Sequence, residues 1–301
     1  MTESVQQPSV MLHQPNSQQR SKNDKKNSYI KDSASRIQSI AQTHGLDALL
    51  QDEPPAKSVF ERAQFREQRR KEQRQKNLEQ ILKLAHRGCK DETAGEPDQD
   101  WLCRFFEMAQ DIHGSSMQKL WAQVLKREVT NPGATSMKAL KVLKDMSPKE
   151  AQTLQRAASL ACSFGGDGSR KLLTGYKAQN GLFSFGKREV TSNLNMGTFH
   201  LPYSSLLVLI ELGLLHSTEL ESGEICVKTP LSLTYQGKNL SLHANAKRVR
   251  LLYFRFSPTG NELCTLLGNK PNSEYYEQIL FILNQKFIVK PEADTSVSHS
   301  V

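Results

Sequence analysis

The sequence is poor in cysteine and has no long apolar run, and these two absences limit the class of protein. Five cysteines are spread over 301 residues, and no two of them form a Cys-x-x-Cys pair. Such usage is typical of reduced thiols in the cytoplasm rather than of a disulfide framework. The longest apolar stretch, residues 206–210, is far shorter than the ~20 residues that a membrane-spanning helix needs. Residues 1–28 lack the apolar core of a secretory signal, so we expect a cytoplasmic protein without a membrane span.

No complete phosphate-binding motif is present. Residues 181–188 (Gly-Leu-Phe-Ser-Phe-Gly-Lys-Arg) have the glycine and lysine spacing of a phosphate-binding loop. In a working loop a Ser or Thr follows the lysine and holds magnesium, but Arg188 stands there. Residues 165–168 (Gly-Gly-Asp-Gly) are interpreted as a glycine cluster that closes a helix, with a phosphate-binding nest as the weaker alternative. We therefore expect no nucleotide cofactor.

Metal and catalytic motifs are missing as well. His86 and Cys89, with Cys103 further along the chain, offer a metal pair, but a structural zinc site needs a second close pair of ligands. The alternative is that His86 stands at a helix end and interacts with the last carbonyl groups of its own helix. The other histidines are isolated in sequence, and neither a serine-hydrolase elbow nor a His-Glu-x-x-His helix occurs. We expect no metal and nominate no catalytic residue. A non-enzymatic protein is favoured, although a triad assembled from distant residues stays open.

Positive charge is concentrated in the N-terminal third of the chain. Residues 1–90 hold 17 Lys and Arg against 10 Asp and Glu, whereas the net charge of the whole chain is +9. A basic arm on a nearly neutral body favours an acidic partner, which is nucleic acid, an anionic membrane surface or an acidic protein. Charge alone specifies no partner, so a merely solvated arm is the alternative.

Composition and periodicity divide the chain into five segments. Residues 1–57 form a disordered basic arm with one weak helix, which we expect to end at Gly45. Residues 1–27 of this arm have too few apolar side chains to offset the entropy of ordering. Residues 58–164 are expected to form a helical domain, and residues 165–198 a Gly-rich connector or hairpin. Residues 199–290 carry a helix followed by strands, and residues 291–301 form a polar, disordered tail.

The strongest helix prediction covers residues 58–87, which contain no Gly or Pro until Gly88 ends the segment. Its first half is charged and rich in Gln. Its second half is amphipathic, because Leu78, Ile81 and Ala85 recur at helical spacing. We expect the apolar half to dock on the helical domain and the basic half to project.

The basic half of this helix supplies candidate contacts to phosphate or to a partner. Several of its arginines share one face at spacings of three and four residues. Glutamates between these arginines reduce the positive electrostatic potential of the face. The alternative to an external contact is that the arginines form Glu–Arg pairs within the helix. A solvated or coiled-coil-like partner helix is therefore weighed against a nucleic-acid contact. The candidate residues are Arg62, Arg66, Arg69, Arg70, Arg74 and Lys76.

The remaining helices of this domain begin at recognisable signals. Asp100, Ser115 or Ser116, and Ser136 precede apolar-periodic segments and are typical N-caps. Ser147, followed by Pro148 and by Glu150 three positions on, predicts a capping box. The helices are predicted over residues 101–112, 117–128, 137–144 and 148–161.

The C-terminal pattern is similar to a winged helix. A helix over residues 202–215 ends in Glu-Leu-Gly-Leu-Leu, and a Pro-Thr-Gly-Asn-Glu-Leu segment opens a helix at 261–267. Winged helices bind DNA, but they also serve as protein-interaction modules. The recognition helix carries almost no Lys or Arg, which argues against direct base readout. Strand-like runs lie between the two helices, at 224–228, 231–235 and 249–257, and a last helix is predicted over 274–285. Basic residues near the wing are further candidates for phosphate or partner contact: Lys247, Arg248 and Arg250.

One signature resembles the core of bacterial proteins with a domain of unknown function. The residues that carry it are Leu120-Trp121-Ala122, Glu128, Pro132-Gly133, Ser136, Leu140, Leu143 and Ser147-Pro-Lys-Glu-Ala151. The likeness covers residues 101–267 and is nearest to an uncharacterised gammaproteobacterial family of conserved hypothetical proteins. It implies a fold and a bacterial cytosolic setting, and it transfers no functional residue.

These observations predict an α+β protein. A mainly helical N-terminal bundle with a long charged helix precedes a smaller, winged-helix-like α/β module. The favoured function is a non-enzymatic binding or regulatory protein that acts on nucleic acid or on a protein partner. The alternatives are a structural or assembly protein that uses a coiled-coil-like helix, and an enzyme of a defence system. The oligomeric state stays open.

Overall fold

The computed structural model describes residues 32–51, 55–90, 93–179 and 189–292. The predicted disordered arm over residues 1–27, the loop 181–188 and the tail from 293 lie outside these residues. The chain divides into two compact units, Met1–Gln68 and Arg69–Val301. The division falls inside the long charged helix α2 (Val59–Gly88).

The first unit contains α1 (Ser33–His44) and the beginning of α2. Asp32 caps α1 by accepting the Ser35 N–H (2.7 Å), and Gly45 ends it in the left-handed conformation at φ 65°. The predicted helix before Gly45 is therefore confirmed. None of the described side chains of this unit is buried.

Helix α2 runs unbroken for 30 residues, and the helix predicted over 58–87 is confirmed. It opens with a reciprocal pair of bonds. The Ser58 N–H donates to Glu61 Oε2 (2.7 Å), and the Glu61 N–H donates to Ser58 Oγ (3.2 Å). In its second half Asn77, Ile81 and Ala85 are buried, whereas residues 63–73 are exposed throughout. The amphipathic half therefore docks on the rest of the second unit.

Four helices follow, and their caps correct two predictions. Helix α3 is capped by Asp98, whose Oδ1 accepts the Trp101 N–H (2.9 Å), because Asp100 already lies inside the first turn. Helix α4 starts after Gly114 rather than after a serine cap, because the chain is helical from Ser115 on. The caps at Ser136 and Ser147 are confirmed. The helices are α3 (Gln99–Ala109), α4 (Ser115–Thr130), α5 (Met137–Asp145) and α6 (Pro148–Leu160).

An aromatic cluster holds these helices together. Trp121 of α4 is fully buried, and its ring lies 5.3 Å from Phe105 of α3, which in turn stacks on Trp101 at 5.1 Å. Leu140 and Leu143 of α5 close the cluster, and Ile81 and Ala85 bring in α2. The signature that resembles the bacterial family is therefore largely a packing device.

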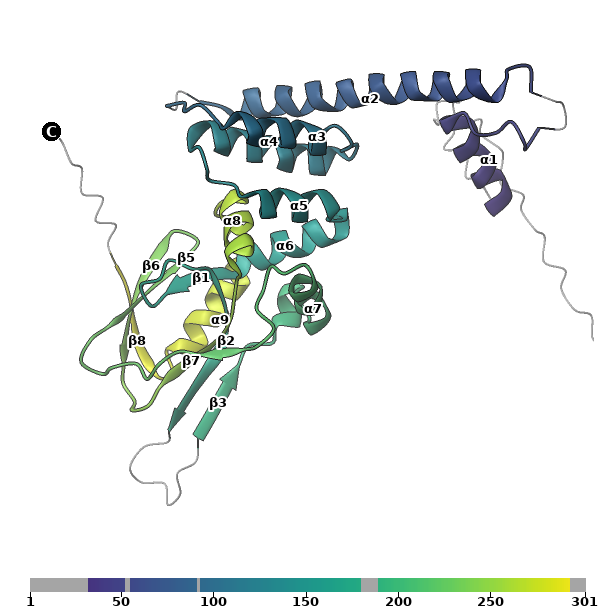
Figure 1. Cartoon of the computed structure of the whole chain (residues 1–301). Coiled ribbons are helices and arrows are strands. Elements are labelled where there is room, and N and C mark those ends of the chain that lie inside the picture. The colour runs from purple at the N-terminus through teal and green to yellow at the C-terminus, as the bar shows by residue number, and fades with distance from the viewer. Residues whose placement is uncertain (1–31, 52–54, 91–92, 180–188, 293–301) are drawn as a thin grey trace, which may run out of the picture. The chain divides into compact units, whose positions relative to one another are not determined.

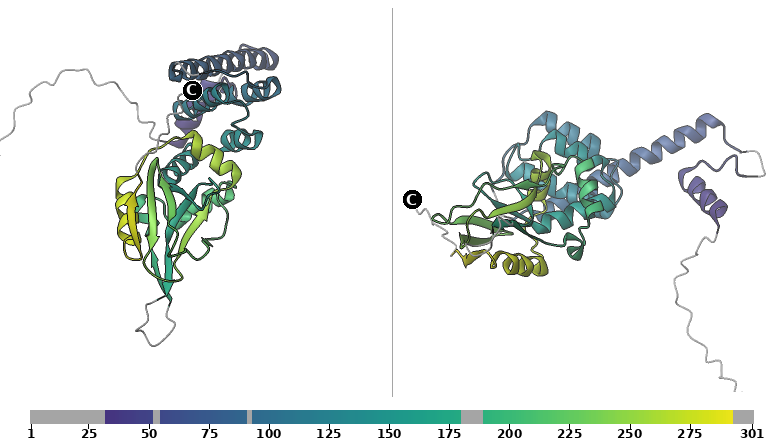
Figure 2. Two further views of the ribbon diagram at one scale, coloured as in Figure 1. Left: turned by 90° about the vertical axis from the view of Figure 1, so that its left-hand side faces the viewer. Right: turned by 90° about the horizontal axis from the view of Figure 1, so that it is seen from below.

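The strands form one antiparallel sheet in the order β4-β7-β2-β1-β5-β6-β8, and β3 pairs with β2 beside this path. Within the second unit, the sheet lies on one side and α3 to α6 lie on the other, as Figure 1 and Figure 2 show. The strands are β1 (Ala161–Phe164), β2 (Lys171–Gln179), β3 (Glu189–Asn193), β4 (Leu220–Glu221), β5 (Leu231–Tyr235), β6 (Lys238–Ala244), β7 (Arg250–Arg255) and β8 (Phe287–Pro291).

The C-terminal predictions are confirmed in part. The strands expected at 231–235 and 249–257 are β5 and β7. Residues 224–228 form a loop instead of a strand, because the chain leaves the sheet after β4. The apolar helix predicted over 202–215 stops earlier, since Gly213 takes a left-handed φ of 68°. The remaining elements are η1 (Met196–Phe199), α7 (Tyr203–Glu211), α8 (Pro258–Leu266) and α9 (Ser273–Leu283).

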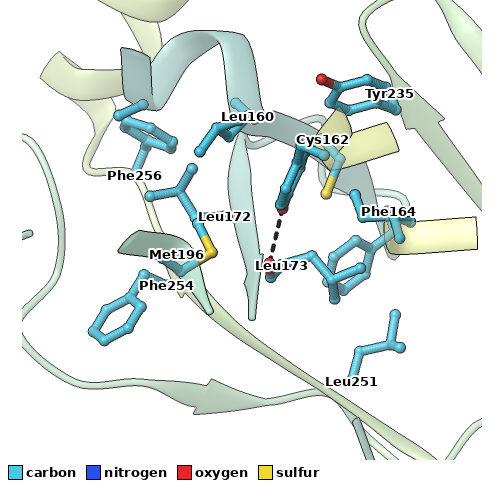
Figure 3. Close-up of a cluster of buried hydrophobic side chains, with 14 of the residues drawn as sticks. Leu160, Cys162, Phe164, Leu172, Leu173, Met196, Tyr235, Leu251, Phe254 and Phe256 are labelled. Carbon is cyan, nitrogen blue, oxygen red and sulfur yellow. Dashed lines mark hydrogen bonds between the residues drawn. The ribbon is translucent and has the colours of Figure 1, made fainter. Parts of the chain in front are cut away.

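The core of the sheet is largely apolar, and its buried tyrosines have hydrogen-bonded hydroxyl groups. Figure 3 shows side chains from β1, β2 and β7 meeting there, among them Cys162, Leu172 and Phe254. Tyr275 of α9 is fully buried, and its hydroxyl donates to the Leu173 carbonyl (2.8 Å). The described residues therefore form a mixed α/β protein with an antiparallel sheet. Among them, no helix is both long and apolar enough to cross a bilayer.

Helix α8 joins the helices to the sheet. A Cβ at Gly260 would lie 2.1 Å from the Leu214 carbonyl oxygen, so only glycine permits this approach. On one side the Asn261 Oδ1 accepts the Arg170 N–H (2.9 Å) at the β1–β2 loop. On the other, Glu262 Oε2 accepts the Ser136 N–H (2.9 Å) at the start of α5.

We expect Trp121→Ala to lower the free energy of unfolding by ~3–5 kcal/mol, because it empties the centre of the aromatic cluster. Urea denaturation followed by circular dichroism measures the change. Trp121→Phe keeps a ring and removes an indole N–H that has no partner among the described residues, so it should cost less. Leu207→Ala, at an exposed position of α7, is the control, and a loss at Trp121 no larger than at Leu207 would contradict the packing role.

Candidate functional site

From Arg69 to Arg87, helix α2 presents a row of cations. Arg69, Lys76 and Lys83 follow one another at intervals of seven residues and therefore lie on one face, which Arg87 extends. All four side chains are exposed. At 1.5 Å per residue the row is roughly 27 Å long. We call these four residues the cationic face of α2.

The predicted contacts on α2 fall into different environments. Arg62 and Arg66 belong to the first unit, and Arg70 is exposed beside the cationic face. Arg74 instead anchors the helix, because its Nε and Nη2 atoms donate to the two oxygens of Asp111 at 2.7 and 3.0 Å. These hydrogen bonds from Arg74 lower the pKa of the Asp111 carboxyl.

A buried polar contact fixes α2 next to this ion pair. Asn77 Nδ2 donates to the Gln110 carbonyl (2.8 Å), and Gln73 Nε2 donates to Asn77 Oδ1 (2.9 Å). Gln118 Nε2 of α4 donates to the Ile112 carbonyl (2.9 Å), which lies in the same α3–α4 loop as Gln110. Residues 73–77 of α2, which we call the base of the helix, are therefore held by specific hydrogen bonds. These bonds keep the cationic face in a fixed orientation on the second unit.

The predicted basic residues near the wing are mostly paired with carboxylates. Arg250 contacts Glu221 (3.0 Å) and Glu224 (3.4 Å), and Arg248 Nε lies 4.0 Å from Glu224. Lys247 is exposed. Within the second unit, β7 lies in the sheet, apart from the second half of α2, so the structure does not bring Arg250 together with Arg74 (Figure 1).

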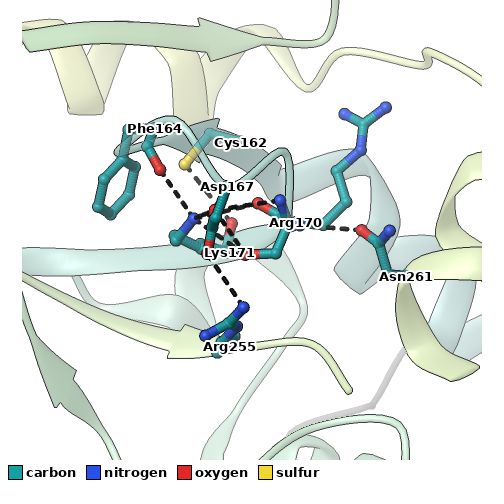
Figure 4. A network of polar contacts seen from close by, with 8 residues as sticks. Cys162, Phe164, Asp167, Arg170, Lys171, Arg255 and Asn261 are labelled. Atoms are coloured by element: carbon teal, nitrogen blue, oxygen red, sulfur yellow. Dashed lines mark hydrogen bonds and ion pairs between the residues drawn. The ribbon is translucent and has the colours of Figure 1, made fainter. Parts of the chain in front are cut away.

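A second polar site surrounds the buried side chain of Lys171, which is 4% exposed (Figure 4). Its ammonium group donates to Asp167 Oδ1 (2.6 Å), to the Phe164 carbonyl (2.8 Å) and to Ser169 Oγ (3.0 Å). Arg255 of β7 contacts the other oxygen of Asp167 at 3.0 Å. The Asp167 carboxylate thus bridges the two cations, and the network closes the β1–β2 loop.

This network replaces both interpretations of residues 165–168. The segment joins two strands, because α6 already ends at Leu160. Its Asp167 accepts bonds from protein donors instead of leaving a nest for phosphate. Burial raises the pKa of Asp167, but the hydrogen bonds from Lys171 and Ser169 outweigh it and set the pKa at about 2.

A cavity of about 420 Å³ lies beside this network, and Cys226 lines it together with Lys171 and Tyr253. The Lys228 N–H donates to the Cys226 sulfur (3.4 Å). This amide, followed by the hydroxyl and amide of Thr229, lowers the pKa of the exposed thiol. Sequence reasoning missed Cys226, because the donors that activate it are set by the conformation of its loop.

The proposed metal pair shows no further ligands. Cys89 and Cys103 are both exposed, and the Cys89 thiol donates to the Ala85 carbonyl (3.3 Å) in the last turn of α2. Across the described part of the chain, no three His, Cys, Asp or Glu side chains form a group able to hold a metal ion.

Comparison with known proteins gives one match. The model of a family described as a protein of unknown function, DUF2806, matches residues 61–280. No curated protein and no solved structure matches the chain. The matched range extends from the charged part of α2 into α9, so the cationic face and every strand of the sheet except β8 lie within one family match.

We expect Cys226 to react first with iodoacetamide near neutral pH, because its thiolate is stabilised and exposed. Burial raises the pKa of Cys162 to about 12 and also raises that of Cys264, so these two should react last. Peptide mass spectrometry after short exposure measures the order. Equal labelling of Cys226 and the exposed Cys89 would contradict the expectation, and Cys226→Ser identifies the fast component.

We expect Asp167→Asn to destabilise the fold by about 1–2 kcal/mol, a value discounted because Asp167 is 37% exposed. The folded pKa lies below the ordinary 3.8, so the carboxylate stabilises the protein above that pH and loses its contribution as the pH falls toward about 2. Between pH 3.8 and about 2, the free energy of unfolding should therefore fall less steeply in the Asp167→Asn variant than in the parent protein. In a Lys171→Met background, Asp167→Asn should lower the free energy of unfolding by a smaller amount. If the effects of the two substitutions simply add, the Lys171–Asp167 pairing is contradicted.

Proposed function

The chain belongs to the DUF2806 family of proteins of unknown function, and from this premise we propose that it is a non-enzymatic binding protein that holds nucleic acid along the cationic face of α2. The observation that carries the proposal is the exposed row of Arg69, Lys76, Lys83 and Arg87 on a helix whose base is fixed. A bacterial, cytoplasmic setting belongs to the same proposal.

A polyanion suits this face better than a single acidic side chain. Double-stranded DNA carries about one negative charge per 1.7 Å of its axis, so a cationic row of roughly 27 Å meets many phosphates. Residues 69–90 hold eight Lys and Arg against two glutamates, Glu72 and Glu79. The acidic residues weaken the field without reversing it. The anchoring bonds of Arg74 and Asn77 also reduce the entropy that binding would cost.

In this proposal the winged-helix-like C-terminal part of the chain contacts protein rather than DNA bases. In chain order, α7, the Leu-Gly-Leu turn, β4, β5, β6, β7 and α8 follow one another. This order is similar to a winged helix, although here the strands belong to a larger sheet. Exposed Tyr203 and Leu207 lie on α7, which carries neither Lys nor Arg. A helix of this composition suits a protein contact better than base readout. We therefore assign sequence-independent phosphate binding to α2 and no base recognition to α7.

A second candidate function is protein assembly, and the first unit favours it. Eight large apolar side chains of its described part are exposed, and they are Ile37, Ile40, Leu46, Leu49, Leu50, Val59, Phe60 and Phe65. Uncovered apolar surface of this kind marks interaction sites. In this alternative the first half of α2 acts as the coiled-coil-like partner helix.

We expect the full chain to bind duplex DNA at about 50 mM salt, with an affinity that falls steeply as salt increases. Changing Arg69, Lys76, Lys83 and Arg87 together to Gln should weaken binding and reduce the slope of log K against log salt by about three to four. Fluorescence anisotropy measures both. The matched control changes Lys138, Lys141, Lys144 and Lys149, all exposed on α5 and α6, and removes the same charge.

Two results would contradict the proposal. One is no binding by the parent chain at low salt, and the other is an equal loss of affinity in the control variant, which would indicate net charge rather than a site. If the parent chain fails to bind but light scattering shows a defined oligomer, protein assembly becomes the better function.

A further inference from the structure

A hollow of about 310 Å³ opens between α4, α6 and the loop that joins α8 to α9. Its volume lies within the range of small-molecule sites. Met117 and Leu120 of α4, together with Leu267 after α8, supply apolar surface. The hollow is separate from the cationic face of α2, whose residues do not line it.

Two lysines flank the hollow from different elements. Lys119 comes from α4 and Lys270 from the α8–α9 loop, and both side chains are exposed. Neither ammonium group has an ion-pair partner among the described residues, and no described acidic side chain lines the hollow. The local charge is therefore about +2 without a counter-charge, which favours an anion carrying about two negative charges.

Side-chain amides complete the lining. Gln123 of α4 and Gln152 and Gln155 of α6 each offer a donor and an acceptor within one group. Paired donors and acceptors of this kind match the hydrogen-bonding edge of a nucleobase. An apolar surface beside them suits the flat face of the same ring.

We propose that this hollow binds a ligand of the mononucleotide class, with its phosphate between Lys119 and Lys270 and its base against the glutamines and Leu267. A phosphate monoester carries about −1.5 to −2 charges near neutral pH, which matches the two lysines. The ligand is either a free nucleotide or the phosphorylated terminal nucleotide of a nucleic acid. The proposal goes beyond the function assigned to α2 and stands if α2 binds no DNA.

Isothermal titration calorimetry of the full chain tests this site with the monophosphates of adenosine, guanosine, cytidine and uridine. Inorganic phosphate and the parent nucleosides serve as partial ligands. We expect at least one mononucleotide to bind saturably, at least about tenfold more tightly than phosphate or its nucleoside. A short oligonucleotide with a terminal phosphate, compared with its unphosphorylated form, distinguishes the two sources of ligand.

The double variant Lys119→Gln, Lys270→Gln should raise the mononucleotide Kd by about tenfold or more. The double variant Lys141→Gln, Lys144→Gln on α5 removes the same charge elsewhere and should leave the Kd unchanged. Equal thermal denaturation midpoints show that both variants are folded. The Gln variant of the cationic face of α2 should also bind the mononucleotide normally, which separates this site from the proposed function.

Three outcomes would overturn the proposal. They are the absence of saturable binding by every mononucleotide, equal binding by nucleoside and nucleotide, and an equal Kd for the site variant and its α5 control. The second outcome would show that the lysines do not hold the phosphate, and the third that only the overall charge matters.

Discussion

The close contact between Gly260 and the Leu214 carbonyl sets the position of α8, and the rest of the second unit depends on that helix. Ser257 strengthens the joint, because its N–H donates to Leu214 O (2.9 Å) and its hydroxyl donates to Gly213 O (2.6 Å). From this position α8 presents Asn261 to the β1–β2 loop and Glu262 to the start of α5. A side chain larger than hydrogen at position 260 would push α8 away from α7 and disturb both bonds.

Several charged residues of this protein maintain the fold rather than bind a ligand. Glu128 is buried and accepts the backbone N–H groups of Gly133 (2.6 Å) and Thr135 (3.1 Å), so it holds the turn between α4 and α5. Lys171 and Asp167 similarly close the β1–β2 loop. Burying the charges of Glu128 and Lys171 is tolerated because each has bonded partners. A charged residue inside a short signature is therefore weak evidence for catalysis here.

The surfaces left for function are those where positive charge is exposed to solvent. On α2, Arg74 is used to anchor the helix, and the cationic face remains exposed beyond it. Beside α4, Lys119 and Lys270 face a hollow whose other lining side chains are neutral. Both surfaces carry positive charge and lie within the second unit, which explains why a phosphate-bearing partner is common to both proposals.

The sequence by itself determined the features that depend on neighbouring residues. The long helix ending at Gly88, the capping box at Ser147 and the left-handed end at Gly45 each follow from a few adjacent side chains. Only the tertiary structure decided that β1 and β8 are strands, because β1 pairs with β5 and β8 pairs with β6, and these partners are distant in the chain. The same holds for the two lysines of the hollow, Lys119 and Lys270, since no local pattern encodes a contact between elements that meet only after folding.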